Sequence, residues 1–173
     1  MRVVAGTHRG RRLHAPGAGT RPTADRVREA LFSILGDVSG MHVLDLFAGS
    51  GALGIEAISR GAAGATFVDS APRAAATVER NLSELGVEAE VVRRDALAYL
   101  RRAGEARFDL VLCDPPYDLA PALTRPLAER LPPVLSADAL IVTESDKRSP
   151  LELPFAILRE RSYGDTRIAV HGV

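Results

Sequence analysis

From His42 onward, short apolar segments bounded by turn residues alternate with segments in which apolar residues recur at helical spacing. The apolar segments predict strands near residues 42–47, 65–69, 88–92, 108–113 and 139–143. The segments between them predict helices near residues 52–59, 72–85, 95–102 and 119–130. Because strands and helices alternate along the chain, the pattern predicts an α/β fold with a parallel sheet.

Further elements are predicted on both sides of this alternating region. Apolar residues recur at helical spacing before Gly36, and Thr23 is suited to cap the helix, so the sequence predicts an amphipathic helix over residues 24–35. Near the end of the chain, Phe155–Leu158 and Arg167–Val170 predict two strands paired as a hairpin. We expect this hairpin to add an antiparallel strand to the sheet.

Residues 1–22 predict a small basic arm ahead of one domain that spans residues 23–173. Within the arm, Arg2–Ala5 and Arg11–His14 predict a short β-hairpin, and Pro16–Gly19 predicts a flexible joint after it. With 173 residues, the chain has the length of a single domain with one active site. We therefore expect the arm to be an appendage of this domain.

The composition is that of an average soluble globular protein, with 46% apolar and 25% charged residues. No apolar segment approaches the roughly 20 residues that span a membrane, and the polar N-terminus lacks the apolar core of a signal peptide. We therefore expect a cytoplasmic protein without a membrane partner. The single cysteine, Cys113, excludes an internal disulfide, and its place in an apolar strand favours a core residue over a nucleophile. The four histidines show no zinc-site spacing, so we expect no bound metal.

Positive charge is concentrated near the N-terminus, although the formal net charge of the chain is zero. Residues 1–28 hold seven arginines against one acid, a net charge of +6, whereas the remainder holds 15 basic and 21 acidic residues, a net charge of −6. Arginine is suited to bidentate phosphate contacts, so this segment is a candidate surface for a nucleic-acid backbone. A solvated charged tail is the alternative interpretation.

A glycine-rich turn, Phe47–Gly54, follows the first predicted strand of the sheet. Glycines permit positive φ angles, and the exposed amides at a helix N-terminus offer hydrogen bonds to a nucleotide. Gly49, Gly51 and Gly54 match the G-x-G-x-x-G pattern of dinucleotide-binding proteins. Asp69 lies about 20 residues further on, where such proteins carry their ribose-binding acid, so a dehydrogenase remains an alternative.

Two acidic residues favour S-adenosylmethionine as the ligand of this turn. Asp45, inside the preceding strand, can balance the cationic methionine portion of that cofactor, whereas it would repel a pyrophosphate. Asp95 follows the third strand, at the sheet edge where α/β proteins bind ligands, and can accept a hydrogen bond from the adenine amino group. The alternatives are a helix cap at Asp95 and a turn-initiating or helix-capping role for Asp69.

The fourth predicted strand ends at Asp114-Pro115-Pro116-Tyr117. The two prolines fix the backbone, so the Asp114 carboxylate and the Pro115 carbonyl can accept both hydrogens of an exocyclic amine on a base. This arrangement aims the nitrogen lone pair at a methyl donor and stabilises the developing positive charge, while Tyr117 can stack on the base. A base must leave its stack to reach such a site. A turn that only terminates the strand is the alternative.

Several segments of the chain match one known family: Arg2–Gly6, Arg9–Leu13, Arg21–Phe32, Asp45–Gly54, Asp114–Tyr117 and Tyr163–Thr166. On these segments the chain resembles, nearly end to end, the bacterial methyltransferases that modify the N2 amine of guanine 966 in 16S ribosomal RNA. The glycine turn and the Asp-Pro-Pro-Tyr motif occur in many amino-methyltransferases. The segment from Arg21 to Phe32 is far more particular and indicates this family.

The resemblance implies a Rossmann-like class I methyltransferase, with S-adenosylmethionine as cofactor and a mostly parallel seven-stranded sheet whose last strand is antiparallel. The expected cofactor contacts are Asp45, Phe47, Gly49, Ser50, Gly51, Asp69, Asp95 and Ala96. The expected catalytic residues are Asp114, Pro115 and Tyr117. The expected RNA contacts are Arg2, Arg9, Arg11, Arg12 and Arg21. The Asp69 position is often glutamate in this family, and we expect the shorter acid still to reach the ribose hydroxyls.

The resemblance also implies 16S ribosomal RNA as the partner, in a partly or fully assembled small ribosomal subunit, and a role in ribosome biogenesis. Two alternatives remain open on the residues alone. An adenine-N6 methyltransferase acting on DNA or RNA can carry the same Asp-Pro-Pro-Tyr motif, although this chain lacks an obvious sequence-reading domain. A non-catalytic RNA-binding protein can retain the same fold.

Overall fold

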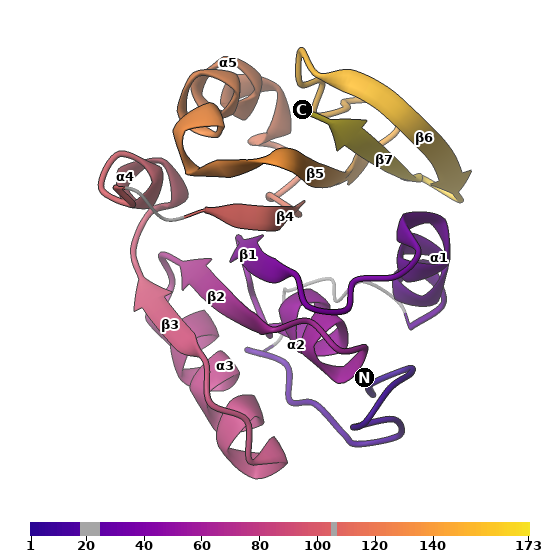
Figure 1. Cartoon of the computed structure of the whole chain (residues 1–173), viewed down its shortest axis with the longest axis vertical. Coiled ribbons are helices and arrows are strands. Elements are labelled where there is room, and N and C mark those ends of the chain that lie inside the picture. Colours follow the sequence, from indigo (N-terminus) through magenta and orange to yellow (C-terminus); the bar gives the residue numbers. More distant parts are fainter. Residues whose placement is uncertain (18–24, 105–106) are drawn as a thin grey trace.

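The computed structural model describes residues 1–17, 25–104 and 107–173, and one sheet of seven strands forms its centre (Figure 1). The strands are β1 (His42–Leu46), β2 (Gly64–Asp69), β3 (Glu90–Arg93), β4 (Phe108–Cys113), β5 (Leu135–Asp146), β6 (Ala156–Tyr163) and β7 (Thr166–Gly172). Their order across the sheet is β3-β2-β1-β4-β5-β7-β6. The first five strands pair in parallel, whereas β7 pairs antiparallel with both β5 and β6. The predicted Rossmann-like sheet with an antiparallel last strand is therefore confirmed.

Helices cover both faces of this sheet. They are α1 (Asp25–Leu35), α2 (Ala52–Ser59), α3 (Pro72–Leu85), α4 (Ala96–Leu100), α5 (Ala120–Arg130) and the 3-10 helix η1 (Pro132–Val134). One core joins α1, α2 and α3 to the sheet, and a second core joins α4 and α5 to it. Successive strand residues such as Val43 and Leu44 enter different cores, because their side chains point to opposite faces. No helix in the described part of the chain is long and apolar enough to cross a membrane.

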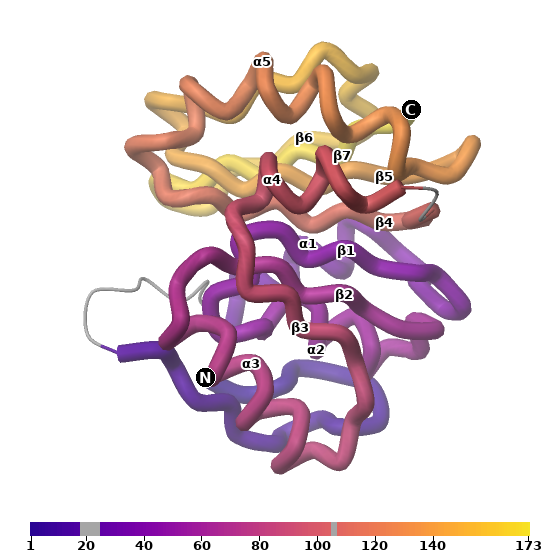
Figure 2. The backbone as a smooth tube through the Cα atoms, turned by 90° about the vertical axis from the view of Figure 1, so that its left-hand side faces the viewer, coloured from indigo at the N-terminus to yellow at the C-terminus, as the bar shows by residue number. Residues whose placement is uncertain are grey.

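Figure 2 shows α5 near the β5–β7 end of the sheet and α3 near the β2–β3 end. The strand predicted at residues 139–143 extends over Leu135–Asp146, because its polar ends also pair with neighbouring strands. The strand predicted at residues 155–158 continues to Tyr163. The helix predicted at residues 24–35 is α1. Its predicted cap and part of the predicted joint lie outside the described residues.

The first 14 residues lie against α2 and α3 (Figures 1 and 2). Their predicted hairpin forms as a single antiparallel bridge between Arg2 and Arg12, with further backbone hydrogen bonds beside it, rather than as two strands. Val3 and Leu13 are 2% and 6% exposed, and both belong to the core formed with α1, α2 and α3. The arm is thus packed on the body of the protein, whereas its division from the rest of the chain as a unit of its own, residues 1–22, stays a prediction.

Glu56 of α2 fixes the arm from the interior. Its carboxylate is 0% exposed and accepts hydrogen bonds from the backbone nitrogens of Val4 at 2.8 Å and Ala5 at 2.9 Å. Arg60 donates to the same carboxylate at 2.8 Å, and Arg28 Nε of α1 lies 3.5 Å from it. A buried carboxylate destabilises a protein unless it is paired and hydrogen-bonded. This network therefore holds the arm and α1 against α2.

Gly6 and Gly10 of the arm provide a matched test of this packing, since both have a φ of +82°. A Cβ atom on Gly6 would lie 1.6 Å from the carbonyl oxygen of Ser59, whereas a Cβ atom on Gly10 would meet nothing within 4 Å. We expect Gly10→Ala to lower the free energy of unfolding by about 1–2 kcal/mol, the cost of a left-handed alanine. Gly6→Ala should cost roughly 1–3 kcal/mol more, because overpacking adds to that cost. Denaturant unfolding measures both values, and equal losses would contradict the docked arm.

Candidate functional site

Acidic side chains lie at the carboxyl ends of five parallel strands. Asp45 lies in β1, Asp69 ends β2, Asp95 follows β3, Asp114 follows β4 and Glu144 lies near the end of β5. Because parallel strands place their carboxyl ends at one edge of the sheet, these residues come together although they are far apart in the sequence. Within the described ranges, no group of three or more His, Cys, Asp or Glu side chains is arranged to hold a metal ion.

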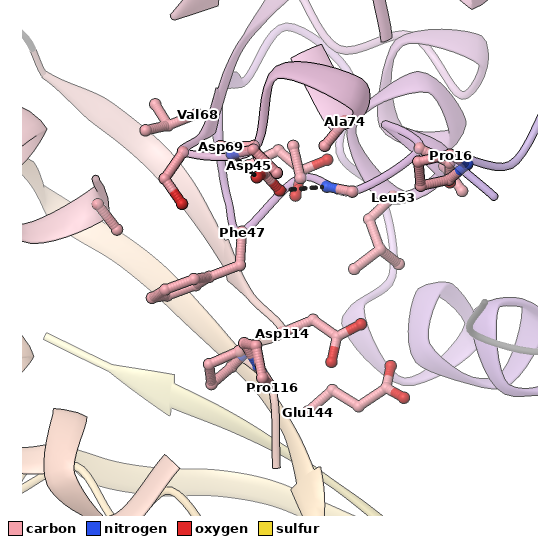
Figure 3. Close-up of a pocket in the computed structure, with 18 of the residues that line it drawn as sticks. Pro16, Asp45, Phe47, Leu53, Val68, Asp69, Ala74, Asp114, Pro116 and Glu144 are labelled. Carbon is pink, nitrogen blue, oxygen red and sulfur yellow. Dashed lines mark hydrogen bonds between the residues drawn. The ribbon is translucent and has the colours of Figure 1, made fainter. Parts of the chain in front are cut away.

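The five carboxyl groups line a cavity of about 970 Å³. Figure 3 labels Asp45, Asp69, Asp114 and Glu144 among them. The structure also brings to this cavity all predicted catalytic and cofactor residues except Gly51, which is buried behind the turn. Asp118 adds a sixth acid to the lining, and Arg73 is the one basic residue among the described lining residues. A cavity of this size accommodates a nucleoside together with a second group. Its negative lining favours a cationic ligand over a pyrophosphate, which counts against a dehydrogenase.

The glycine turn between β1 and α2 has the backbone geometry expected of a ligand-binding turn. Gly49 and Gly51 have φ angles of 56° and 77°, and Gly51 is the N-cap of α2. Phe47, at φ 62°, is the one non-glycine residue with a positive φ in the described part of the chain, a strained conformation for an aromatic residue. Gly54 lets α2 pack closely against β2, because a Cβ atom there would lie 2.4 Å from Cε1 of Phe67. The turn therefore lets its backbone approach both a ligand and the sheet.

The carboxylates of Asp69 and Asp95 organise the loops that border the cavity. Asp69 accepts hydrogen bonds from the backbone nitrogens of Gly49 at 2.9 Å and Ala71 at 2.8 Å. Asp95 is the N-cap of α4 and accepts from the nitrogen of Ala98 at 2.9 Å. The turn and cap interpretations of these acids are thus confirmed. Each carboxylate keeps further lone pairs that can accept hydrogen bonds from a ligand.

Asp45 lies beneath the turn and is 2% exposed. Its Oδ2 accepts a hydrogen bond from the nitrogen of Gly54 at 2.9 Å. Burial raises the pKa of the Asp45 carboxyl well above its ordinary value, and the nearby carboxylates of Asp114 and Asp69 raise this pKa further. A cation in the cavity would reverse this effect by stabilising the ionised form.

The Asp-Pro-Pro-Tyr motif forms the wall of the cavity on the β4 side. Pro115 is buried, whereas Asp114 and Tyr117 are half-buried and face the cavity. The Tyr117 hydroxyl lies 3.2 Å from Oγ1 of Thr166 in β7, which restrains the ring at the wall. The neighbouring Cys113 is 1% exposed, and burial raises the pKa of its thiol far above the ordinary value. The interpretation of this cysteine as a core residue is therefore confirmed.

The arginines of the arm that the structure describes are exposed: Arg2, Arg9, Arg11 and Arg12. The side chains of Arg2 and Arg11 donate to backbone carbonyls at 2.8 and 2.7 Å. Arg9 and Arg12 have no side-chain partner among the described residues. Arg21 lies outside those residues, so its predicted RNA contact stays a prediction.

Arg28 differs from the other arginines near the N-terminus. Its side chain is 0% exposed, pairs with Asp25 at 2.8 Å and donates to the carbonyl oxygen of Arg2. It belongs to the buried network around Glu56 and presents no surface to a nucleic acid. Its inclusion in the candidate phosphate-binding segment is therefore corrected, and the reason is that charge along a sequence does not reveal burial.

Several residues that line the cavity come from segments in which the sequence shows no functional motif, and they were not predicted. Met1 lines the cavity, and its sulfur accepts a hydrogen bond from the Ser50 hydroxyl at 3.4 Å. Pro16 and Thr166 also line it, and Glu144 does so while only 4% exposed. A signal for Glu144 was present, because an acid at the end of a parallel strand is expected at the ligand-binding edge.

Comparison with known proteins places the chain among methyltransferases. The model of the family described as conserved hypothetical protein 95 matches residues 1–172. The ribosomal RNA small subunit methyltransferase D of Haemophilus influenzae is 37% identical over 174 residues, which cover 95% of this chain and 89% of that protein. The solved structure of a hypothetical protein of Thermus thermophilus matches with a TM-score of 0.88 and 32% identity, over 100% of this chain and 99% of that one.

A more distant structure shares the fold alone. It is the 16S rRNA N2 G1207 methyltransferase of Thermus thermophilus, solved with AdoMet and guanosine. The TM-score is 0.72 at 24% identity, over 90% of this chain and 44% of that one. Together with the sheet order and the likeness to ribosomal RNA small subunit methyltransferase D, these structures confirm the class I methyltransferase fold.

The raised pKa of Asp45 predicts proton release when the predicted cofactor, S-adenosylmethionine, binds. The free protein holds the Asp45 proton above the ordinary pKa of about 3.9, and a bound cation favours the carboxylate. Between the ordinary pKa and the raised one, binding should therefore release a proton, and affinity should increase as the pH rises. Calorimetry in buffers of different ionisation enthalpy counts this proton. Asp45→Asn should abolish its release, and identical release by the variant would contradict the role of Asp45.

Proposed function

The chain belongs to the conserved hypothetical protein 95 family, which includes ribosomal RNA small subunit methyltransferase D, and from this membership we propose that it methylates ribosomal RNA. The proposed reaction transfers a methyl group from S-adenosylmethionine to the N2 amine of a guanine in 16S ribosomal RNA, guanine 966. The observation that carries this proposal is the position of Asp114 and Pro115 on the wall of the cavity, beside the glycine turn. They supply the two acceptors that an exocyclic amine requires.

The cavity fits the proposed cofactor. S-adenosylmethionine supplies, when bound, a methyl group made electrophilic by its sulfonium centre. The buried Asp45 carboxylate would balance the cationic methionine portion, and residues 47–50 of the turn, which line the cavity, would border the ligand. Asp69 retains lone pairs for ribose hydroxyls, and Asp95 retains them for the adenine amino group. Ala96, at the start of α4, is buried beside that subsite.

The target amine lies at the opposite side of the cavity in this proposal. Asp114 and the Pro115 carbonyl accept its two hydrogens, which directs the nitrogen lone pair toward the methyl donor. The new bond to nitrogen replaces the bond from the methyl group to sulfur, so the nitrogen becomes positively charged, and it then loses one proton to water. The Asp114 carboxylate stabilises this charge as it develops. Tyr117, restrained by Thr166, stacks on the base.

The arm supplies the contact with the RNA backbone. Its exposed arginines lie on the same chain segment as Met1 and Pro16, which line the cavity. Phosphates are attracted to the arginines and repelled by the acidic cavity, so the backbone stays outside while the flipped base enters. We propose that the substrate is 16S RNA within a partly or fully assembled small subunit, as the resemblance implies.

Transfer of a labelled methyl group tests this function. The protein is incubated with labelled S-adenosylmethionine and small ribosomal subunits from cells that lack the enzyme, and the labelled nucleoside is identified by mass spectrometry. N2-methylguanosine at one 16S position is the expected product. Label on adenine N6 alone would overturn the guanine assignment, and no label on any ribosomal RNA would overturn the function.

Asp114→Asn should abolish most of the transfer while leaving the fold and cofactor binding intact. The amide replaces one acceptor by a donor that meets the amine hydrogens, and it removes the charge that stabilises the transition state. We expect kcat to fall on the order of 100- to 1,000-fold, the range found when other enzymes lose one group that stabilises charge in the transition state. Asp138→Asn, an exposed site near the other end of β5, is the matched control and should leave kcat unchanged. Full activity of Asp114→Asn would contradict its catalytic assignment.

The arm is tested by the salt dependence of RNA binding. Arg9 and Arg12 are exposed and have no side-chain partner among the described residues, so replacing both by alanine should leave stability unchanged. Each lost phosphate contact should reduce the slope of log affinity against log salt by about 0.7–0.9. Arg125→Ala on α5, whose side chain is 89% exposed, is the control and should not alter the slope. An unchanged slope in the double variant would exclude these two arginines as phosphate contacts.

A further inference from the structure

Glu144 is an acid of the cavity to which neither the motif nor the proposed cofactor site assigns a role. It lies in β5 and pairs with Ile168 of β7, and its side chain is 4% exposed. Despite this burial, it lines the cavity. A carboxyl group that is withdrawn from water and yet borders a ligand site is a candidate for a function at that site.

Glu144 and Asp114 occupy equivalent positions on adjacent strands. Thr143 of β5 is paired with Cys113 of β4 in parallel register, so the next residue along each strand lies on the same side of the sheet. Figure 3 shows the carboxyl groups of Asp114 and Glu144 close together, and both residues line the cavity. A base whose amine is held by Asp114 can therefore present one of the two ring atoms that flank the amine to Glu144.

The chemistry of that neighbouring atom differs among the bases. In guanine, the N2 amine is flanked by N1–H, a second donor, and by N3, which carries a lone pair. In adenine, both ring nitrogens near the N6 amine carry lone pairs, and in cytosine N3 beside the N4 amine also carries one. A carboxylate accepts a hydrogen bond from guanine N1–H and is repelled by a lone pair in the other two bases. Two adjacent carboxylates thus match the contiguous donors of guanine alone.

We propose that Glu144 selects guanine by accepting the N1–H hydrogen while Asp114 and Pro115 hold the N2 amine. This inference rests on the proposed guanine-N2 function and adds the residue that distinguishes guanine from adenine within a motif that serves both. A carboxylate that accepts a substrate N–H discriminates strongly against a base with a lone pair at the same position, because two acceptors then face each other without a hydrogen between them. Glu144 is thus a specificity-determining residue.

The test compares guanine with 2-aminopurine, which keeps the N2 amine but has a lone pair at N1. Small subunits are reconstituted with 16S RNA ligated from segments, so that the position methylated by the wild-type protein carries either base. For wild-type protein, kcat/KM should be on the order of 100-fold or more higher for guanine. Glu144→Gln offers an amide donor to N1, so it should lower guanine methylation and narrow this preference at least tenfold. 2-Aminopurine also lacks the O6 atom of guanine. This difference affects the ratio of kcat/KM values for the two bases equally in both proteins, so it does not contribute to the change between wild type and variant.

The controls separate recognition from folding. Glu88→Gln, an exposed acid near the opposite edge of the sheet, should keep the wild-type preference. Glu144→Asp retains the negative charge. It should keep the preference for guanine over 2-aminopurine, even if the shorter side chain lowers the rate of methylation. Calorimetry with S-adenosylmethionine checks that each variant still binds the cofactor.

The outcomes distinguish this inference from the function on which it rests. A narrowed preference in Glu144→Gln, retained in Glu144→Asp, supports the inference. An unchanged ratio between guanine and 2-aminopurine in Glu144→Gln overturns it, whatever happens to the rate. Failure of the wild-type protein to methylate guanine N2 overturns the proposed function and the inference with it, and is visible without any variant.

Discussion

The shared carboxyl edge of five parallel strands is the constraint on which the rest of this structure depends. It gathers carboxyl groups from five separate segments around one cavity of about 970 Å³, with Arg73 the one basic residue among the described lining residues. Burial is the main cause of the raised pKa of Asp45, and repulsion from the nearby carboxylates of Asp114 and Asp69 raises this pKa further. Ligands that bring positive charge or hydrogen-bond donors relieve this repulsion. A sulfonium cofactor and the amine edge of a guanine supply both.

The arm carries the opposite charge and is built into the same core. Glu56, buried in α2, accepts hydrogen bonds from the arm backbone, and α2 begins at the glycine turn that borders the cavity. The surface proposed for phosphates and the site proposed for the base are therefore parts of one rigid arrangement. In the proposed function, this separation of charge favours an RNA backbone outside the cavity and a base inside it.

The sequence predicted the fold and most of the cavity because their patterns are local. Alternating apolar segments located the strands of the sheet, and the glycine turn and the Asp-Pro-Pro-Tyr motif marked the loops after β1 and β4. Three features depended on contacts between distant segments and were missed. The arm packs on α2, where the buried Glu56 accepts hydrogen bonds from its backbone, and Arg28 turns inward to that glutamate. Glu144 belongs to a polar extension of β5 that pairs with β7. The sequence carries no local signal that these polar side chains are buried.

The central claim is that the ring of carboxylates orients a guanine against the methyl donor. A crystal structure of the protein with S-adenosylhomocysteine and guanosine tests this claim most directly. We predict that guanine N2 lies within about 3.2 Å of both an Asp114 carboxylate oxygen and the Pro115 carbonyl oxygen. N1 should face Glu144, and the methionine portion of the ligand should lie toward Asp45. A guanine bound with O6 toward Asp114, or a cofactor product bound away from the glycine turn, would contradict the account.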